Sequence, residues 1–216
     1  GNISVKLNDN EFLCTPTGVS KGFMTPDYIC KVDRNGNVIE ANGRFKPSSE
    51  IKMHMRVYQK RPDVGSVVHA HPSYATAFAI AGIPLTAPIM PEAVIALGCV
   101  PIAKYGTPST NEIPDAVEEY LPYYDAVLLE NHGALSYSVD LLSAYHKMES
   151  LEFYAELLYK ARQLGLPGKH PANLCPNARE GKPNCHSCGG SCGSTADASP
   201  ELVAEITRKV LEQLNR

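Results

Sequence analysis

Two histidines separated by one residue occur in the stretch VVHAHPSYATAFA, residues 67–79. In a β-strand, residues i and i+2 point to the same side, so His69 and His71 can present two ring nitrogens to one point in space. The preceding Ser-Val-Val is typical of a buried strand, and burying two unpaired imidazoles is costly. We therefore favour metal ligands over the alternative, two polar residues on a half-exposed strand face.

A third histidine follows another apolar stretch, in LLENHGALS, residues 128–136. His132 precedes Gly133, a residue that can turn the chain sharply. Three histidines with one open position form the ligand set of a catalytic zinc site. Taken alone, His132 is more typical of a polar residue at a strand end, so the interpretation depends on all three histidines.

A carboxylate that can act as a base occurs in KPSSE, residues 46–50, where a helix is predicted to begin. Glu50 is expected in the first turn of that helix, with Ser48 or Ser49 as its N-cap. Helix N-termini favour anions, so the two serines are candidates for phosphate binding. A common helix cap is the alternative for the same motif.

Hydrophobic periodicity predicts the elements that position these residues. The first half alternates short strands with turns, and Asn35-Gly36 predicts a tight hairpin. A buried strand is predicted over 66–71, and a strand that turns at Gly133 over 125–138. Helices are predicted over these ranges: 48–62, 72–82, 110–122 and 140–165. The pattern indicates an α/β domain with a central antiparallel sheet flanked by helices.

Composition limits the size and the partners of the protein. A chain of 216 residues, 44% of them hydrophobic, has room for one domain with a real core. The net charge of −3 and the scattered basic residues exclude a basic stripe for nucleic acid and a polybasic membrane patch. No apolar run approaches the roughly 20 residues that span a bilayer. We expect a cytosolic protein with small-molecule partners.

The two ends of the chain differ from its middle. It starts at Gly1, directly on a strand-like pattern, so we expect that an N-terminal segment is missing. Residues 166–198 are rich in Pro, Gly, Ser and Cys and cannot bury a core, which predicts a linker. Residues 199–216 predict an amphipathic helix with Ser199 as N-cap, suited to docking.

The linker holds four of the seven cysteines: Cys175, Cys185, Cys188 and Cys192. Four thiols can form a structural zinc site or hold an iron–sulfur cluster. Their spacing matches neither template closely. Redox-labile thiols and a merely flexible linker therefore remain as alternatives.

Several motifs together resemble the class II aldolase/adducin family, whose enzymes include L-fuculose-1-phosphate aldolase and L-ribulose-5-phosphate 4-epimerase. In chain order they are GNIS, TPTG, PSSE, RPDVGSVVHAHPSYATA and ENHGAL, and the resemblance covers roughly residues 1–160. It implies a catalytic domain over 1–165, a three-layer α/β/α fold with a central, mainly antiparallel sheet, and a homotetramer with active sites at subunit interfaces. The implied reaction cleaves a deoxyketose-1-phosphate to dihydroxyacetone phosphate and a small aldehyde such as lactaldehyde.

The resemblance also implies roles for individual residues. His69, His71 and His132 match the ligands of the divalent metal, usually zinc, with manganese or cobalt as alternatives. Glu50 matches the acid/base that approaches the metal in the resting enzyme. The phosphate pocket is matched by Asn2, Thr17, Gly18, Ser48 and Ser49.

One departure from the family pattern concerns the acid that acts on the aldehyde half. Fuculose phosphate aldolase has a tyrosine acid downstream of its histidine pair, but residues 83–98 contain no tyrosine. Glu92 is the only ionisable residue there, and we expect it to serve instead; the alternative is a polar residue after Pro91 at a helix start. Rhamnulose-1-phosphate and a 5-deoxypentulose-1-phosphate therefore stay open as substrates.

Other activities within and outside the family remain to be separated. The alternatives are a sugar-phosphate 4-epimerase or dehydratase and, from a different class, an adducin-like scaffold. Adducin-type heads lack the ligand histidines, so the three histidines here argue against a scaffold.

The final helix, 199–216, resembles the encapsulation peptides that direct enzymes into bacterial microcompartments by docking on shell or cargo proteins. This resemblance places the enzyme in the lumen of such a compartment. A helix that packs back on its own oligomer is the alternative.

Overall fold

The computed structural model describes residues 1–165. The predicted linker over 166–198, its four cysteines and the predicted docking helix over 199–216 lie outside the described residues.

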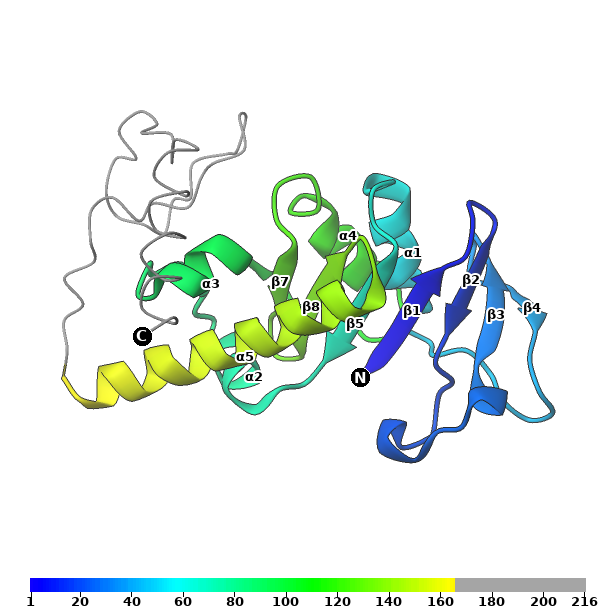
Figure 1. Cartoon of the computed structure of the whole chain (residues 1–216), viewed down its shortest axis with the longest axis horizontal. Coiled ribbons are helices and arrows are strands. Elements are labelled where there is room, and N and C mark those ends of the chain that lie inside the picture. Colours follow the sequence, from blue (N-terminus) through cyan, green and yellow to red (C-terminus); the bar gives the residue numbers. More distant parts are fainter. Residues whose placement is uncertain (166–216) are drawn as a thin grey trace, which may run out of the picture.

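One eight-stranded sheet forms the centre of the described domain, in the order β4-β3-β2-β1-β5-β8-β7-β6 (Figure 1). All neighbouring strands pair antiparallel except β6 and β7. The strands are β1 Asn2–Lys6, β2 Glu11–Cys14, β3 Cys30–Asp33, β4 Val38–Glu40, β5 Ser66–Ala70, β6 Ile102–Ala103, β7 Ala126–Leu129 and β8 Gly133–Ser138. The predicted, mainly antiparallel sheet is confirmed.

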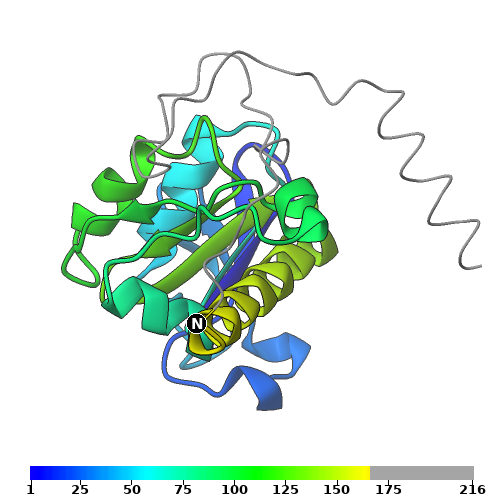
Figure 2. The ribbon, with the colours of Figure 1, turned by 90° about the vertical axis from the view of Figure 1, so that its left-hand side faces the viewer.

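Helices cover both faces of the sheet and give the three-layer α/β/α fold (Figure 2). One layer contains α1 (Ile51–Lys60) and α4 (Glu112–Glu118), whose apolar side chains share a core with Val67 of β5. The other contains α2 (Ser73–Ile80), α3 (Pro91–Ala96) and α5 (Leu141–Gln163), which share a core with Val68. Side chains along β5 alternate between the two faces of the sheet, so Val67 and Val68 enter different cores. His69, two residues after Val67, therefore points towards the α1 layer.

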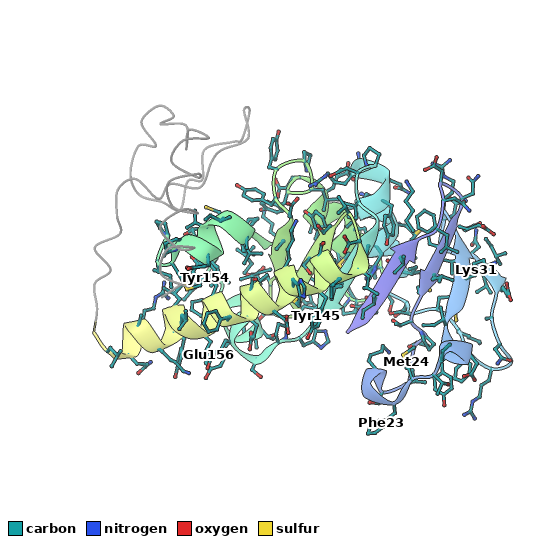
Figure 3. All side chains as sticks on the ribbon, viewed as in Figure 1. Phe23, Met24, Lys31, Tyr145, Tyr154 and Glu156 are labelled. Carbon is teal, nitrogen blue, oxygen red and sulfur yellow. The ribbon has the colours of Figure 1, made fainter. Side chains whose placement is uncertain are left out.

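Local sequence signals explain how the long helix α5 begins and ends. The side chain of its N-cap residue, Asp140, accepts a hydrogen bond from the Ser143 N–H at 2.7 Å. The chain leaves the helix through Gly165, whose φ of +70° suits glycine. Tyr154 of α5 is 2% exposed and packs in the core, whereas Tyr145 is 46% exposed (Figure 3). No helix within residues 1–165 is both long and apolar enough to cross a membrane.

The loop between β2 and β3 contains two short 3-10 helices, η1 (Lys21–Phe23) and η2 (Pro26–Tyr28). The Lys21 ammonium donates to the carbonyl oxygens of Pro16 and Val19 and holds the start of this loop. At the tip of the loop, Phe23 is 83% exposed (Figure 3).

Two details of the predicted elements were wrong. The stretch 125–138 forms a hairpin of β7 and β8 rather than one strand that turns at Gly133. The left-handed residue of that turn is Asn131, with φ of +56°, and Gly133 is the first residue of β8. The N-cap of α1 is Glu50, not a serine, although the Ser48 hydroxyl accepts from the Glu50 N–H at 3.3 Å.

Candidate metal centre

His69 and His71 lie at the end of β5 and direct their rings to the same place. β5 ends at Ala70, so His71 is the first residue after the strand and still points to the side of His69. The two Nε2 atoms are 3.0 Å apart. The other nitrogen of His69, Nδ1, is 2.9 Å from the Ala134 carbonyl oxygen and must donate to it. This bond leaves the Nε2 lone pair of His69 free for a ligand.

The β7–β8 hairpin brings His132 to the same point. Its ring centroid lies 4.8 Å from that of His69 and 5.1 Å from that of His71. A Cβ atom added at Gly133 would lie 2.5 Å from the Ala70 carbonyl oxygen and 2.7 Å from Cδ2 of His71. Only glycine therefore allows the hairpin to approach β5 this closely.

Glu50 lies beside the three histidines, at the N-cap of α1. Its Oε1 atom is 3.1 Å from Nε2 of His132, and its Oε2 atom is 3.5 Å from Nε2 of His69. Burial raises the pKa of Glu50, but the hydrogen bond to His132, the charges of His69 and His132, and the Asn2 amide lower it more, to about 2. The carboxylate is therefore ionised at neutral pH.

The donor set suits a divalent ion. One ligand nitrogen from each histidine can be chosen so that all three lie within 4.8 Å of one another. Zinc–nitrogen bonds of 2.0–2.1 Å in a tetrahedron place ligand atoms about 3.3 Å apart. The Nε2 atoms of His69 and His71 are 3.0 Å apart, and the Glu50 oxygens lie 3.1 and 3.5 Å from Nε2 of His132 and His69, which are values near that spacing. Burial lowers the pKa of His69 to about 3, which keeps its imidazole neutral, as ligation requires.

The Nδ1 atom of His132 is buried and has no hydrogen-bond partner among the described residues. A buried ring nitrogen without a partner is costly, so the bonding capacity of this imidazole is not fully used within the described residues. The fold brings together the three histidines that the sequence predicts as metal ligands.

A buried polar network behind Glu50 was missed by the sequence prediction. The amide of Asn2 bonds to both Glu50 and His54, and His54 bonds to Ser4, which bonds to Tyr58. His54 and Ser4 are each 1% exposed. A signal was available: His54 and Tyr58 are four residues apart in the predicted helix and share its apolar face.

The predicted phosphate-pocket residues lie on two segments that run side by side, with Asn2 nearby. The Thr17 N–H donates to the Lys46 carbonyl at 2.9 Å, and the Ser48 N–H donates to the Thr15 carbonyl at 3.3 Å. Gly18 follows with φ of +71°. Thr17 and Ser49 are exposed, whereas the Asn2 side chain is buried and bonded to Glu50.

A pocket adjoins Glu50 on the side of the loop before α4. It is lined by Ser49, Glu50, Lys52, Met53, Ser109, Thr110, Ile113 and Pro114. Glu50 thus faces both the histidine cluster and a pocket. Glu92 is exposed in the first turn of α3, after Pro91, and within residues 1–165 no hydrogen bond or ion pair joins it to the histidines.

The family model of the class II aldolase and adducin N-terminal domain matches residues 1–159. The chain belongs to this family. An L-fuculose phosphate aldolase of Methanococcus maripaludis is 36% identical over 159 residues, 74% of this chain and 84% of that protein. A 3-oxo-tetronate 4-phosphate decarboxylase of Haemophilus influenzae is 34% identical over 163 residues, 74% of this chain and 76% of that protein.

A third relative of this class II aldolase is the 5-deoxy-D-ribulose 1-phosphate aldolase of Bacillus thuringiensis, 31% identical over 180 residues and 82% of each chain. The solved structure of an L-fuculose 1-phosphate aldolase superposes with a TM-score of 0.71 at 34% identity, covering 77% of this chain and 78% of that one. The predicted family and fold are confirmed. The protein is a metal-dependent aldolase, a carbon–carbon lyase of a family that acts on sugar phosphates.

Proposed function

We propose that this class II aldolase cleaves a deoxyketose-1-phosphate, such as L-fuculose- or L-rhamnulose-1-phosphate, between C3 and C4. The products are dihydroxyacetone phosphate and lactaldehyde or a similar aldehyde. The observation that carries the proposal is the convergence of three imidazoles, whose ligand nitrogens lie within 4.8 Å of one another, beside one ionised carboxylate 3.1 and 3.5 Å from two of them.

His69, His71 and His132 would hold the ion, with zinc as our choice and manganese or cobalt as alternatives. A bound divalent ion supplies Lewis-acid stabilisation of the negative charge that develops on substrate oxygens. Neutral imidazoles and a carboxylate are the ligands that zinc favours.

Glu50 would move the proton at C3. When the C3–C4 bond breaks, the C4 hydroxyl loses its proton, C4 becomes the aldehyde carbon, and the electron pair of the bond stays on C3. Glu50, ionised in the resting site, takes up a proton from solvent and delivers it to C3, which completes dihydroxyacetone phosphate, while the proton of the C4 hydroxyl passes to Glu92 and on to solvent. In the direction of synthesis, the ionised Glu50 removes the proton from C3, since its carboxylate lies beside the histidines, 3.1 Å from Nε2 of His132.

Two further sets of residues would act on the substrate, one on its phosphate and one on its aldehyde half. Ser48, Ser49, Thr17 and Gly18, with Asn2, would bind its phosphate, since Thr17, Gly18 and Ser49 are exposed near the N-terminus of α1. Glu92 would exchange a proton with the aldehyde half. Phosphate binding away from the reacting bond contributes orientation rather than chemistry.

The decarboxylase relative favours a second candidate function, decarboxylation of a 3-oxo acid phosphate. Loss of carbon dioxide leaves an electron pair beside a carbonyl, as aldol cleavage does, so the same ion and acid/base serve both reactions. Two of the three relatives described above are aldolases, at 36% and 31% identity, and one is the decarboxylase, at 34%. We therefore place the aldolase first.

Substrate trials separate these activities. The zinc-loaded full chain is incubated with fuculose-1-phosphate, rhamnulose-1-phosphate, 5-deoxyribulose-1-phosphate and a 3-oxo-tetronate 4-phosphate. A coupled reductase detects triose phosphate, and trapped carbon dioxide reports decarboxylation. Triose from at least one sugar phosphate supports the proposal. Carbon dioxide without triose supports the decarboxylase, and isomerisation without triose supports the epimerase.

We also propose a homotetramer with active sites between subunits, because the family resemblance implies one. Light scattering of the purified full chain tests this oligomeric state.

Residues 199–216 are proposed to dock on microcompartment shell or cargo proteins, tethered by 166–198. A fluorescent reporter fused to residues 196–216 should co-purify with shells. A diffuse reporter in shell-forming cells would contradict the docking proposal.

A further inference from the structure

Four hydrogen bonds in series connect Glu50 with Tyr58 in the interior of the domain. Asn2 Nδ2 is 2.5 Å from Glu50 Oε2, and His54 Nε2 is 2.6 Å from Asn2 Oδ1. His54 Nδ1 is 2.7 Å from Ser4 Oγ, which is 2.8 Å from the Tyr58 hydroxyl. The chain of bonds begins at Glu50 and leads away from the metal ligands into the core between β1 and α1.

The chemistry of the five groups fixes the direction of every bond. An ionised carboxylate can only accept, so the Asn2 atom that faces Glu50 is the amide nitrogen, and its amide oxygen faces His54. An amide oxygen can only accept, so Nε2 of His54 carries a hydrogen. Burial lowers the pKa of His54 to about 4, so the ring is neutral and Nδ1 accepts from Ser4. The Ser4 oxygen then accepts from Tyr58.

Each side-chain polar atom of the network has a hydrogen-bond partner, and the network occupies space that apolar side chains fill elsewhere along α1. Met53, Met55 and Val57 are buried on the same helix. Partly satisfied polar groups in a core are costly, whereas a complete network fixes a unique arrangement. Both ring nitrogens of His54 are used in it, so His54 is not a further metal ligand.

We propose that His54 is a positioning residue for the proton transfer at Glu50. It holds the Asn2 oxygen, which directs the Asn2 amide hydrogen at Oε2 of Glu50. The carboxylate thereby keeps one oxygen bonded and the other, Oε1, turned to the side of His132. Ser4 and Tyr58 support the required tautomer of His54. The inference rests on the proposed role of Glu50 as acid/base.

The test measures the proton transfer alone, in the absence of aldehyde. Dihydroxyacetone phosphate is incubated in D₂O with the zinc-loaded full chain, and proton NMR follows the exchange of its C–H hydrogen for deuterium. His54→Leu removes the donor to Asn2 and should slow exchange about 10- to 100-fold, the usual effect of removing an outer-shell partner. Zinc content should stay unchanged.

Two conservative comparisons separate positioning from folding. In the His54→Gln variant, the glutamine amide nitrogen reaches the place of Nε2 and can donate to Asn2. Its exchange rate should therefore fall by less than about tenfold, the lower end of that range. Ser4→Ala should slow exchange, because it removes the donor to Nδ1 of His54. Its matched control is Ser136→Ala, which removes a hydroxyl that is equally buried and bonded at 2.8 Å to the Ala144 carbonyl oxygen, on the α5 side. Exchange by this control should equal wild type.

A spectroscopic measurement checks the tautomer directly. Nitrogen-15 NMR of histidine-labelled full chain, with His54→Gln to identify the signal, should show a neutral ring protonated at Nε2. A ring protonated at Nδ1 would overturn the inference. So would Ser4→Ala and His54→Leu proteins that fold and exchange at the wild-type rate. If Glu50→Gln itself exchanges normally, the proposed acid/base role is wrong; if only His54→Leu and Ser4→Ala are normal, the positioning role alone is wrong.

Discussion

The close contact between Gly133 and the end of β5 makes Gly133→Ala a sensitive test of the histidine cluster. The added Cβ atom would lie 2.5 Å from the Ala70 carbonyl oxygen and 2.7 Å from Cδ2 of His71, whereas ordinary contacts begin at 3.4 Å. The two segments must therefore separate by about 0.7 to 0.9 Å, the difference between those distances. Metal ligands tolerate displacements of only about 0.2 Å.

We expect Gly133→Ala to lower the free energy of unfolding by about 1 to 3 kcal/mol, as overpacked sites do. Zinc affinity should fall by about 10- to 100-fold, because His71 and His132 can no longer converge on one ion. Urea denaturation measures the first quantity, and competition with a chromophoric chelator measures the second. The cysteines beyond residue 165 are common to every variant, so the difference in affinity reports on the histidines.

Gly22→Ala is the matched control, because a Cβ at Gly22 meets no atom within 4 Å and its φ lies outside the left-handed region. Its effect on unfolding should stay within about 0.5 kcal/mol, and its zinc affinity should equal wild type. A Gly133→Ala protein that binds zinc as tightly as the Gly22→Ala protein would refute the proposed packing of the site.

Other carboxylates of the domain give three further predictions. Glu50→Gln should keep its zinc but lose about 10²- to 10⁴-fold in deuterium exchange into dihydroxyacetone phosphate, measured by NMR; unchanged exchange would exclude Glu50 as the base. Glu152→Ala should lower the free energy of unfolding by about 1 to 2 kcal/mol in urea, because its carboxylate accepts from the N–H groups of Tyr74 and Ala75 at the start of α2; wild-type stability would argue against this cap. Burial raises the pKa of Asp125, but Lys147 and Arg61 lower it more, so its stabilisation is present above the unfolded pKa of about 3.9 and is lost as pH falls through the folded value. Asp125→Asn should therefore flatten the acid side of the stability profile, and an unchanged slope would contradict this linkage.

Much of the fold could be predicted because local patterns and tertiary structure agree. The strand predicted over 66–71 is β5, Ser66–Ala70, and the helix predicted over 140–165 is α5, Leu141–Gln163. The histidine pair was predictable from the two-residue period of a strand, even though His71 lies one residue beyond β5.

Other features depend on contacts between segments that no local pattern encodes. Gly133 was predicted to turn the chain, but its lack of a side chain serves the approach to Ala70, and Asn131 makes the turn. The serines were predicted as helix caps, because the sequence does not reveal that Glu50 itself takes the N-cap position. The bond from His54 to Asn2 joins residues 52 positions apart, so it becomes visible only when α1 is placed beside β1 in the fold.

Diffraction at the zinc absorption edge from crystals of the full-length, zinc-loaded chain tests the central claim most directly. The anomalous map should place a zinc ion about 2.0 to 2.1 Å from one ring nitrogen each of His69, His71 and His132, with the Glu50 carboxylate beside it. The claim would be contradicted by a map whose zinc lies only among the linker cysteines, or by the three rings pointing away from one another.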